Sequence, residues 1–156
     1  AGALQGVHRT WLAPDGQEKA AVDTPRRAMG HLLGNAVRIA PADQTLVLGE
    51  GIETMLSVRE AAPSLPVWAA LSSGHLGAVL LPDGLQRLYI AIDRDPAGQR
   101  AAERLTARAT EAGIAVMVLE PQLGDFNDDL RAHGAEALRQ HLAQQIDLKD
   151  QHRLTI

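Results

Sequence analysis

Three acidic residues follow two runs of β-forming residues, at the points where those runs end. Glu50 comes directly after residues 45–49, and Asp93 and Asp95 follow residues 88–92 with one residue between them. In an open α/β sheet, ligands bind beyond the carboxyl ends of the strands, where these acids are expected to lie. Carboxylates from two strand ends can supply oxygen ligands to Mg²⁺, which keeps waters for exchange with substrate phosphates. The spacing therefore predicts a divalent-cation site that acts on phosphoryl groups.

Structural roles for the same acids are the alternative. Asp95 precedes Pro96 and suits the N-cap of a helix, because its side chain can accept backbone N–H groups and proline is favoured at the first helical position. Glu50 can be an acid favoured by a helix dipole. Asp93 is harder to explain in this way, since a carboxylate at the end of a buried strand loses solvent and needs a partner. We favour the metal site over a coincidence of capping residues.

Composition limits the class of protein. The chain has 156 residues, of which 46% are hydrophobic and 22% charged, which is typical of a globular domain with a sizeable core. It has no cysteine, which excludes disulfides and cysteine zinc sites and fits a cytoplasmic protein. The net charge of −4 argues against broad, non-specific binding of polyanions. No apolar run approaches the roughly 18–20 residues of a membrane span, so no membrane partner is expected.

The order of the predicted elements indicates an α/β fold. We expect a small β-rich lobe over residues 1–43, an α/β core over 44–132, and a C-terminal helix with a polar, fraying tail over 133–156. In the core, strands alternate with helices, which predicts a mainly parallel four-stranded sheet flanked by helices. Its strands are predicted at 45–49, 67–71, 87–92 and 114–119, and the helices at 51–61, 96–112 and 134–146.

The N-terminal lobe is predicted mainly from its turn. A strand over residues 6–12 is followed by Ala-Pro-Asp-Gly at 13–16, in which Pro, Asp and Gly suit successive turn positions. Residues 19–22 are expected to return as the second strand of a hairpin, and residues 36–40 as a further short strand. The segment 24–34 is either a loop or a short helix.

The two acidic motifs resemble those of a known family. Residues 48–53 read Leu-Gly-Glu-Gly-Ile-Glu and residues 92–98 read Ile-Asp-Arg-Asp-Pro-Ala-Gly. Together they are similar to the Toprim domain of bacterial primases, type IA and type II topoisomerases, OLD-type nucleases and the recombination mediator RecR. Residues 6–12, 35–39 and 124–128 are similar to a plasmid- and phage-borne branch of Toprim primases, usually found in longer primase or primase-helicase chains. The resemblance implies a Toprim-like, Rossmann-like fold over about residues 44–132.

The resemblance also implies roles for individual residues. Glu50 would be a general acid/base or metal-proximal acid, and Asp93 and Asp95 would bind Mg²⁺ or Mn²⁺. Asp125 matches an acid that could hold a second ion in bacterial primases, but the second acid of that primase pattern is replaced by Asn127 here. Further candidates, each with ordinary surface or a plain turn as the alternative, are Glu53 and Asp128 near the ion, Gly51 and Gly98 for close phosphate approach, and Arg94, Arg9, Arg26 and Arg27 for nucleic acid or nucleotide phosphates.

The activity implied is that of a DNA primase-like catalytic domain in plasmid or phage DNA replication. It would transfer nucleotides from nucleoside triphosphates, with Mg²⁺, on a single-stranded DNA template, beside a helicase or other modules of a longer chain. A Toprim metal-dependent nuclease and a non-catalytic RecR-like nucleic-acid-binding scaffold are the alternatives. A haloacid-dehalogenase-type phosphatase is more distant, because Ala97 stands where those enzymes carry Thr or Val. The single tyrosine lies inside a predicted strand, so this chain alone is not expected to be a topoisomerase.

Overall fold

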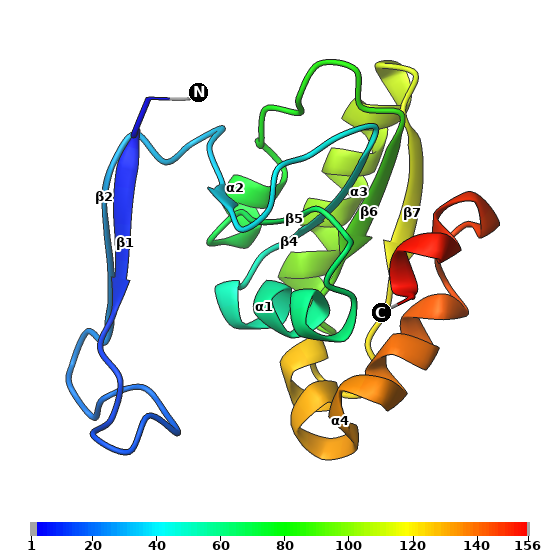
Figure 1. Cartoon of the computed structure of the whole chain (residues 1–156). Helices are drawn as coiled ribbons and strands as arrows, with labels where there is room; N and C mark the ends of the chain where they lie inside the picture. The colour runs from blue at the N-terminus through cyan, green and yellow to red at the C-terminus, as the bar shows by residue number, and fades with distance from the viewer. Residues whose placement is uncertain (1–2, 156) are drawn as a thin grey trace.

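The computed structural model describes residues 3–155 and confirms the α/β class. One sheet has five strands in the order β3-β5-β4-β6-β7, and only β3 is antiparallel to its neighbour (Figure 1). We expected four strands, with residues 36–40 in the N-terminal lobe. Residues 37–38 instead pair with β5 and extend the sheet by one strand. The strands are β3 (Val37–Arg38), β4 (Thr45–Gly49), β5 (Val67–Ala69), β6 (Arg87–Ala91) and β7 (Ala115–Leu119).

Helices cover both faces of the sheet, and side chains of its central strands alternate between the two layers. Val47 and Tyr89 belong to a core shared with α1 and α4, whereas Leu48 and Ile90 belong to a core shared with α2 and α3. Coverage on both sides explains why the predicted strands are almost wholly apolar. Among the described residues, no helix has the length and apolar character that a membrane crossing requires. The helices are α1 (Ile52–Ala61), α2 (Ser73–Leu76), α3 (Pro96–Glu111), α4 (Phe126–Ala143) and the 3₁₀ helix η1 (Leu148–Leu154).

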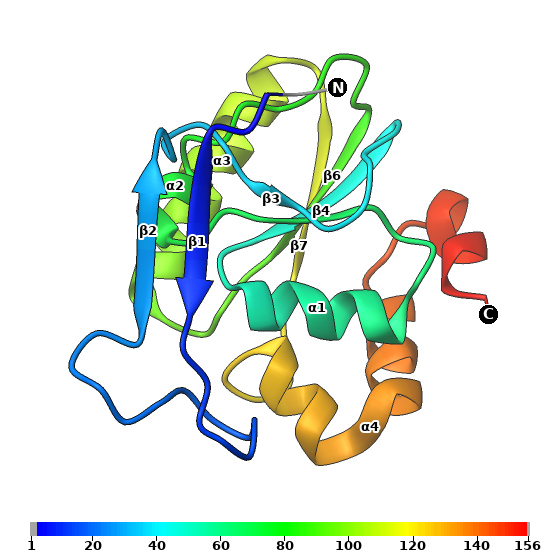
Figure 2. The ribbon, with the colours of Figure 1, turned by 60° about the vertical axis from the view of Figure 1, so that its left-hand side comes forward.

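The N-terminal hairpin is paired differently from our prediction. Strand β1 (Gly6–Thr10) pairs with β2 (Arg26–Gly30), and the predicted return strand contributes a single bridge between Leu12 and Lys19. The partner strand therefore lies in the segment that we had left as loop or short helix. Gly30 requires its glycine, since its φ is 103° and a Cβ there would lie 2.4 Å from the Gln5 carbonyl oxygen. The hairpin stands beside the α/β core (Figures 1 and 2).

Helix α4 starts eight residues before the predicted position. Asp125 caps it by accepting the backbone N–H of Asp128 at 2.8 Å, and two acids in the first turn favour this start through the helix dipole. Gly134 interrupts the helix with φ 81° and ψ 168°. The apolar periodicity used for the prediction resumes only after that glycine, which explains the late boundary.

The polar tail is not frayed as we expected. It forms η1, and Asp150 is completely buried beneath the first residues of β4 and β6. Its carboxylate accepts hydrogen bonds from the Arg87 guanidinium at 2.5 and 2.8 Å, from the Tyr89 hydroxyl at 2.8 Å and from the Thr45 hydroxyl at 3.1 Å. Burial alone would raise the pKa of Asp150, but the hydrogen bonds from Arg87 and Tyr89 outweigh it and lower the pKa to about 2. A buried polar network thus fixes the tail.

Replacing Asp150 by Ala should lower the free energy of unfolding by about 3 kcal/mol, because the Arg87 charge keeps little solvent and loses its partner. The folded pKa lies below the ordinary value of 3.8, so this contribution is full above about pH 4. It is lost as the pH falls through about 2. Urea unfolding at several pH values measures the effect, with the exposed Asp83→Ala as control. Equal stability of the two variants at pH 7 would contradict the role of the network.

Candidate functional site

The acids of the two sequence motifs lie at the same end of the sheet, beyond the carboxyl ends of its parallel strands. Strands β4 and β6 are adjacent and parallel, with Gly49 opposite Ala91. Glu50 follows the tip of β4, and Asp93 follows the tip of β6 after one intervening residue. The two carboxylates therefore lie at neighbouring strand ends, where a parallel sheet presents ligand sites.

An open cleft of about 810 Å³ lies at these strand ends. The core contributes most of its carboxylates and Arg131, and the hairpin with its connecting loop contributes Lys19 and Arg26 together with Glu18. Both kinds of side chain therefore face one space. The lining includes Glu50, Gly51, Glu53, Thr54 and Asp93 from the sheet edge and α1, Asp125, Asn127 and Arg131 at the start of α4, and Lys19 and Arg26 from the hairpin.

Asp93 has the most perturbed carboxyl group of the cleft. Burial raises its pKa, and the charges of Asp125, Glu50 and Asp95 raise it further, to about 6. The Thr54 hydroxyl, 3.4 Å from Oδ1 of Asp93, opposes this shift weakly. Thr54 was not among the predicted site residues, although it lies one helical turn after Glu50. A carboxylate held among three others is a site that a cation would stabilise.

Glu50 is also perturbed. Burial raises its pKa, and the charge of Asp95 adds to the rise, while the backbone N–H of Ser73 and the guanidinium of Arg26 oppose it. The net pKa is raised, so this carboxyl group holds a proton more readily than an exposed glutamate. A raised pKa makes the ionised carboxylate a better proton acceptor.

Asp95 has the structural role considered as the alternative. Its Oδ1 accepts the backbone N–H groups of Ala97 and Gly98 at 2.8 and 2.7 Å and caps helix α3. Its second oxygen carries none of these bonds, and its charge still acts on both Asp93 and Glu50. Capping and a place at the acidic edge therefore coexist in one residue.

The residues that flank Asp95 lie around the turn after β6. Arg94 is exposed, and its backbone N–H donates to the Gly124 carbonyl oxygen at 2.9 Å, which ties this turn to the loop before α4. Gly98 is buried, and a Cβ there would lie 3.1 Å from the Asp93 carbonyl oxygen. Gly98 therefore allows α3 to approach the backbone of Asp93.

The residues at the start of α4 have separate roles. Asp125 lines the cleft while it caps the helix, and Asn127 lines the cleft while its Oδ1 accepts a hydrogen bond from the Ser57 hydroxyl at 3.3 Å. Asp128 is exposed. Asp129, which we did not predict, is buried and accepts the backbone N–H groups of residues 122 and 123, both at 2.8 Å. Asp129 thus orders the loop that presents Asp125.

The predicted arginines divide between two places. Arg26 reaches from the hairpin to form an ion pair with Glu53 on α1, across the cleft. Burial raises the pKa of Glu53, but hydrogen bonds from its own backbone and from Arg26 outweigh it, and the net pKa is lowered. Arg9 and Arg27 lie opposite each other in the hairpin and line a separate hollow with Trp11. The structure does not bring these two arginines to the acids.

Two further basic residues line the cleft, and of these Arg131 was missed by our sequence reading. Lys19 lies in the hairpin connection, and Arg131 lies on α4. Arg131 could have been found from a correct helix start, since it follows Asn127 by four residues and so shares its helix face. Within residues 3–155, Arg131 forms no ion pair despite the surrounding carboxylates. Its guanidinium is therefore available to an anionic ligand.

The donor set fits a cation that retains water ligands. Within the part of the chain that the structure describes, no three His, Cys, Asp or Glu side chains form a group that could already hold a metal ion. The acids nevertheless raise one another's pKa, so their charges act on one another. Mg²⁺ commonly uses one or two protein carboxylates, with water and substrate phosphates completing its shell. Asp93, with Asp95, Glu50 and Asp125 near it, suits that mode of binding.

Comparison with protein families identifies most of the chain. The family model described as "Toprim domain" matches residues 45–136, and one described as "Domain of unknown function (DUF7146)" matches residues 1–39. No curated protein matches the chain in sequence. The first match therefore covers the four parallel strands β4 to β7, the acidic motifs and the start of α4, and leaves β3 outside.

Comparison with solved structures shows the same fold in a primase. The primase fragment of the bacteriophage T7 primase-helicase protein matches with a TM-score of 0.63 and 18% identity, over 91% of this chain. The chain spans 62% of the length of that fragment. The zinc-binding and RNA polymerase domains of the Aquifex aeolicus primase match with a TM-score of 0.47 and 24% identity, over 67% of this chain and 27% of that one. At 18% identity, the T7 match shows the fold and leaves the activity open.

Asp93 should make the stability of the protein depend on pH. Its folded pKa of about 6 lies above the ordinary 3.8, so the folded state loses stability as the pH rises from about 4 to about 6. Asp93→Asn should remove this loss and raise the melting temperature at pH 7, with a smaller gain at pH 4. Thermal unfolding across this range measures it, with Asp83→Asn as control. An unfolded Asp93→Asn protein, or one with the wild-type pH profile, would disprove this electrostatic account.

Proposed function

The chain belongs to the Toprim family, and we propose that it is the catalytic domain of a DNA primase-like protein. The observation that carries the proposal is the placement of Glu50 and Asp93 at the tips of adjacent parallel strands, in a cleft that also contains basic side chains. The carboxylates of the cleft suit a divalent cation, and its basic side chains suit the phosphates of a nucleotide. The fold shared with a T7 primase fragment supports the same assignment.

Each residue then has a defined task. Asp93 and Asp95 would hold Mg²⁺ or Mn²⁺. Asp125 would contribute to a second ion, and Asn127 stands where a further acidic ligand of that ion would be expected. When bound, the ion polarises phosphoryl oxygens and offsets developing negative charge. Glu50 accepts the proton of the attacking 3′-hydroxyl as its oxygen bonds to the α-phosphorus of the incoming nucleotide and pyrophosphate leaves. The raised pKa of Glu50 supports this proton transfer.

The basic residues bind the substrate phosphates. Arg131, on α4, and Lys19, in the hairpin connection, both line the cleft, and each can contact a polyphosphate bound there. Arginine suits this role because its planar guanidinium can donate two parallel hydrogen bonds to a phosphate. Arg26 can change partner from Glu53 to a phosphate when a substrate enters. Arg94, exposed and between the two acids in sequence, would bind nucleotide phosphates.

The wider setting is part of the same proposal. We propose a single-stranded DNA template and nucleoside triphosphates as substrates, and a helicase or other modules on a longer chain as partners, in plasmid or phage DNA replication in the cytoplasm. Arg9 and Arg27 would contact template phosphates from the hairpin, away from the acids. We also retain the division into an N-terminal lobe (1–43), a Toprim core (44–132) and a C-terminal segment (133–156).

Template-directed synthesis tests the reaction directly. Incubation with single-stranded DNA, nucleoside triphosphates and Mg²⁺ should yield short oligonucleotides, and Asp93→Asn or Glu50→Gln should lower the rate at least about 100-fold. Asp83→Asn, far from the cleft, is the matched control. Shortening of the template without synthesis would identify a nuclease. The protein is a scaffold if it binds DNA without a metal ion and neither synthesises nor cleaves a strand. In that case Asp93→Asn should leave DNA binding unchanged.

Arg131 should contribute to nucleotide binding. Arg131→Gln should raise KM for the nucleoside triphosphate about tenfold, since a hydrogen bond to a charged group contributes roughly 1.5 kcal/mol. The matched control is Arg139→Gln on the same helix, because Arg139 is paired with Glu136. Steady-state kinetics measure both variants. Equal KM values for the two variants would remove Arg131 from the substrate site.

A further inference from the structure

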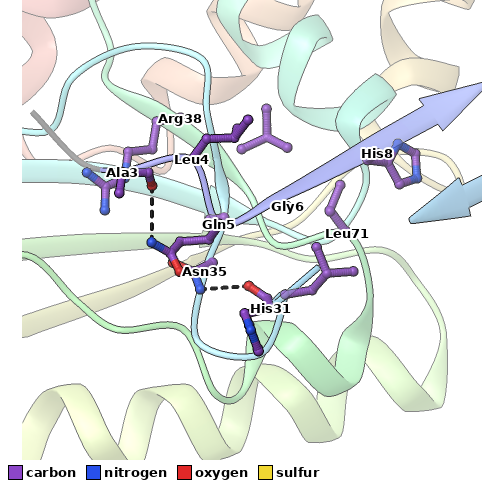
Figure 3. Close-up of a pocket in the computed structure, with 12 residues that line it drawn as sticks. Ala3, Leu4, Gln5, Gly6, His8, His31, Asn35, Arg38 and Leu71 are labelled. Carbon is purple, nitrogen blue, oxygen red and sulfur yellow. Dashed lines mark hydrogen bonds between the residues drawn. The ribbon is translucent and has the colours of Figure 1, made fainter. Parts of the chain in front are cut away.

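We propose that a second pocket, which adjoins the acidic cleft, binds the heterocyclic base of a nucleotide or of a nucleic-acid strand. This hairpin pocket has a volume of about 350 Å³ and lies between the start of the hairpin and the segment that leads into β3 (Figure 3). Its polar side chains include Gln5, His8, Asn35 and Arg38, and its apolar side chains include Leu4 and Leu71. The inference rests on the proposed function, because it assigns the base end of the same substrate.

The hairpin pocket and the acidic cleft meet at Leu71. This residue lines both spaces and follows β5 at the sheet edge that carries Glu50. A ligand with phosphates in the cleft therefore has its other end within reach of the hairpin pocket. The two spaces together run along the side of the hairpin that faces the core, since Gly6 and His8 line one and Lys19 and Arg26 the other.

Leu71 is held in an unfavourable backbone conformation. Its φ is 77°, and within residues 3–155 no other residue except glycine has a positive φ. The left-handed region costs about 1 kcal/mol for a residue with a side chain. The backbone N–H of Leu71 donates to the Glu50 carbonyl oxygen at 2.8 Å, which fixes this conformation next to the catalytic candidate. Strain of this kind concentrates at functional sites and is kept here at the boundary of the two spaces.

The chemistry of the hairpin pocket differs from that of the cleft, because no carboxylate of residues 3–155 lines it. The Gln5 and Asn35 amide nitrogens donate to the carbonyl oxygens of Ala3 and His31, at 3.3 and 2.9 Å. Neither side-chain oxygen accepts a hydrogen bond from the described part of the chain. Two amide oxygens in one pocket can accept the N–H groups at the edge of a base.

The remaining side chains fit the rest of a base. The Arg38 guanidinium lies over the Trp68 ring, 4.7 Å from its centroid, and its N–H groups can donate to acceptors of a ligand. His8 adds a ring nitrogen, and Leu4 and Leu71 supply apolar contacts for the faces of the base. A phosphate fits less well, because the two amide oxygens would face its negative charge. A flat group with apolar faces and a polar edge matches this lining.

Nucleosides test the hairpin pocket without metal or phosphate. Saturation-transfer-difference NMR with the wild-type protein should show strong transfer to base protons, and Gln5→Ala should reduce it several-fold. Asn35→Ala should act in the same way, and Gln5→Ala, at an exposed position, keeps the test valid if the Asn35 variant is unstable. Gln86→Ala, exposed at the opposite edge of the sheet, is the matched control. Absence of transfer in the wild type, or equal transfer in the Gln5 variant, would overturn the proposal.

Charged ligands identify the source of the base. With Mg²⁺, a nucleoside triphosphate should bind about tenfold more tightly than inorganic triphosphate, and Gln5→Ala should remove most of this advantage while inorganic triphosphate binds unchanged. If the base belongs to the template, Gln5→Ala should instead weaken binding of a single-stranded oligodeoxynucleotide. If Gln5→Ala weakens binding of neither the nucleoside triphosphate nor the oligodeoxynucleotide, the base-pocket proposal is wrong.

The two proposals fail separately. Asp93→Asn should abolish synthesis and keep the nucleoside signal, because the hairpin pocket contains none of the acids. Loss of the nucleoside signal in a wild-type protein that synthesises oligonucleotides would remove only the base pocket. A nucleoside signal in a protein without synthesis would remove only the catalytic proposal.

Discussion

The candidate site depends on several carboxylates that lie close together at the carboxyl ends of the parallel strands. Asp93 is partly removed from water and lies near the charges of Asp125, Glu50 and Asp95, so its ionised form is disfavoured until a cation is present. Such an arrangement lowers the stability of the folded protein at neutral pH. It persists because the surrounding fold leaves these residues little freedom to move apart, as expected at functional sites that store strain.

Several features of the fold hold these acids in place. The parallel register of β4 and β6 sets Glu50 beside Asp93, and the two buried cores on either side of the sheet fix both strands. Asp95 and Asp125 cap helices, which fixes their side chains, and the charges of both act on Asp93. At the other end of the same two strands, hydrogen bonds to Asp150 hold their first residues in place. The tail therefore stabilises the strands whose other ends carry the acids.

Sequence reasoning recovered what is local or periodic. The strand ends at Glu50 and Asp93 and the alternation of strands and helices could be read directly, because buried parallel strands are apolar runs with abrupt polar ends. Pairings between distant segments could not be read. The exposed residues 26–30 lack the alternation of a half-buried strand, and the two-residue β3 is too short for a pattern. Asp150 is polar in sequence but is buried by partners 61 to 105 residues away. Arg131 was missed because its helix was predicted to begin too late.

The most direct measurement is the pKa of Asp93 itself, by carboxyl ¹³C NMR with and without Mg²⁺. The account predicts a pKa of about 6 without the ion and a marked fall when Mg²⁺ is added, while the resonance of the distant Asp83 is unchanged. An ordinary pKa near 4, or a raised pKa that Mg²⁺ leaves unchanged, would contradict the claim that these carboxylates form a cation site.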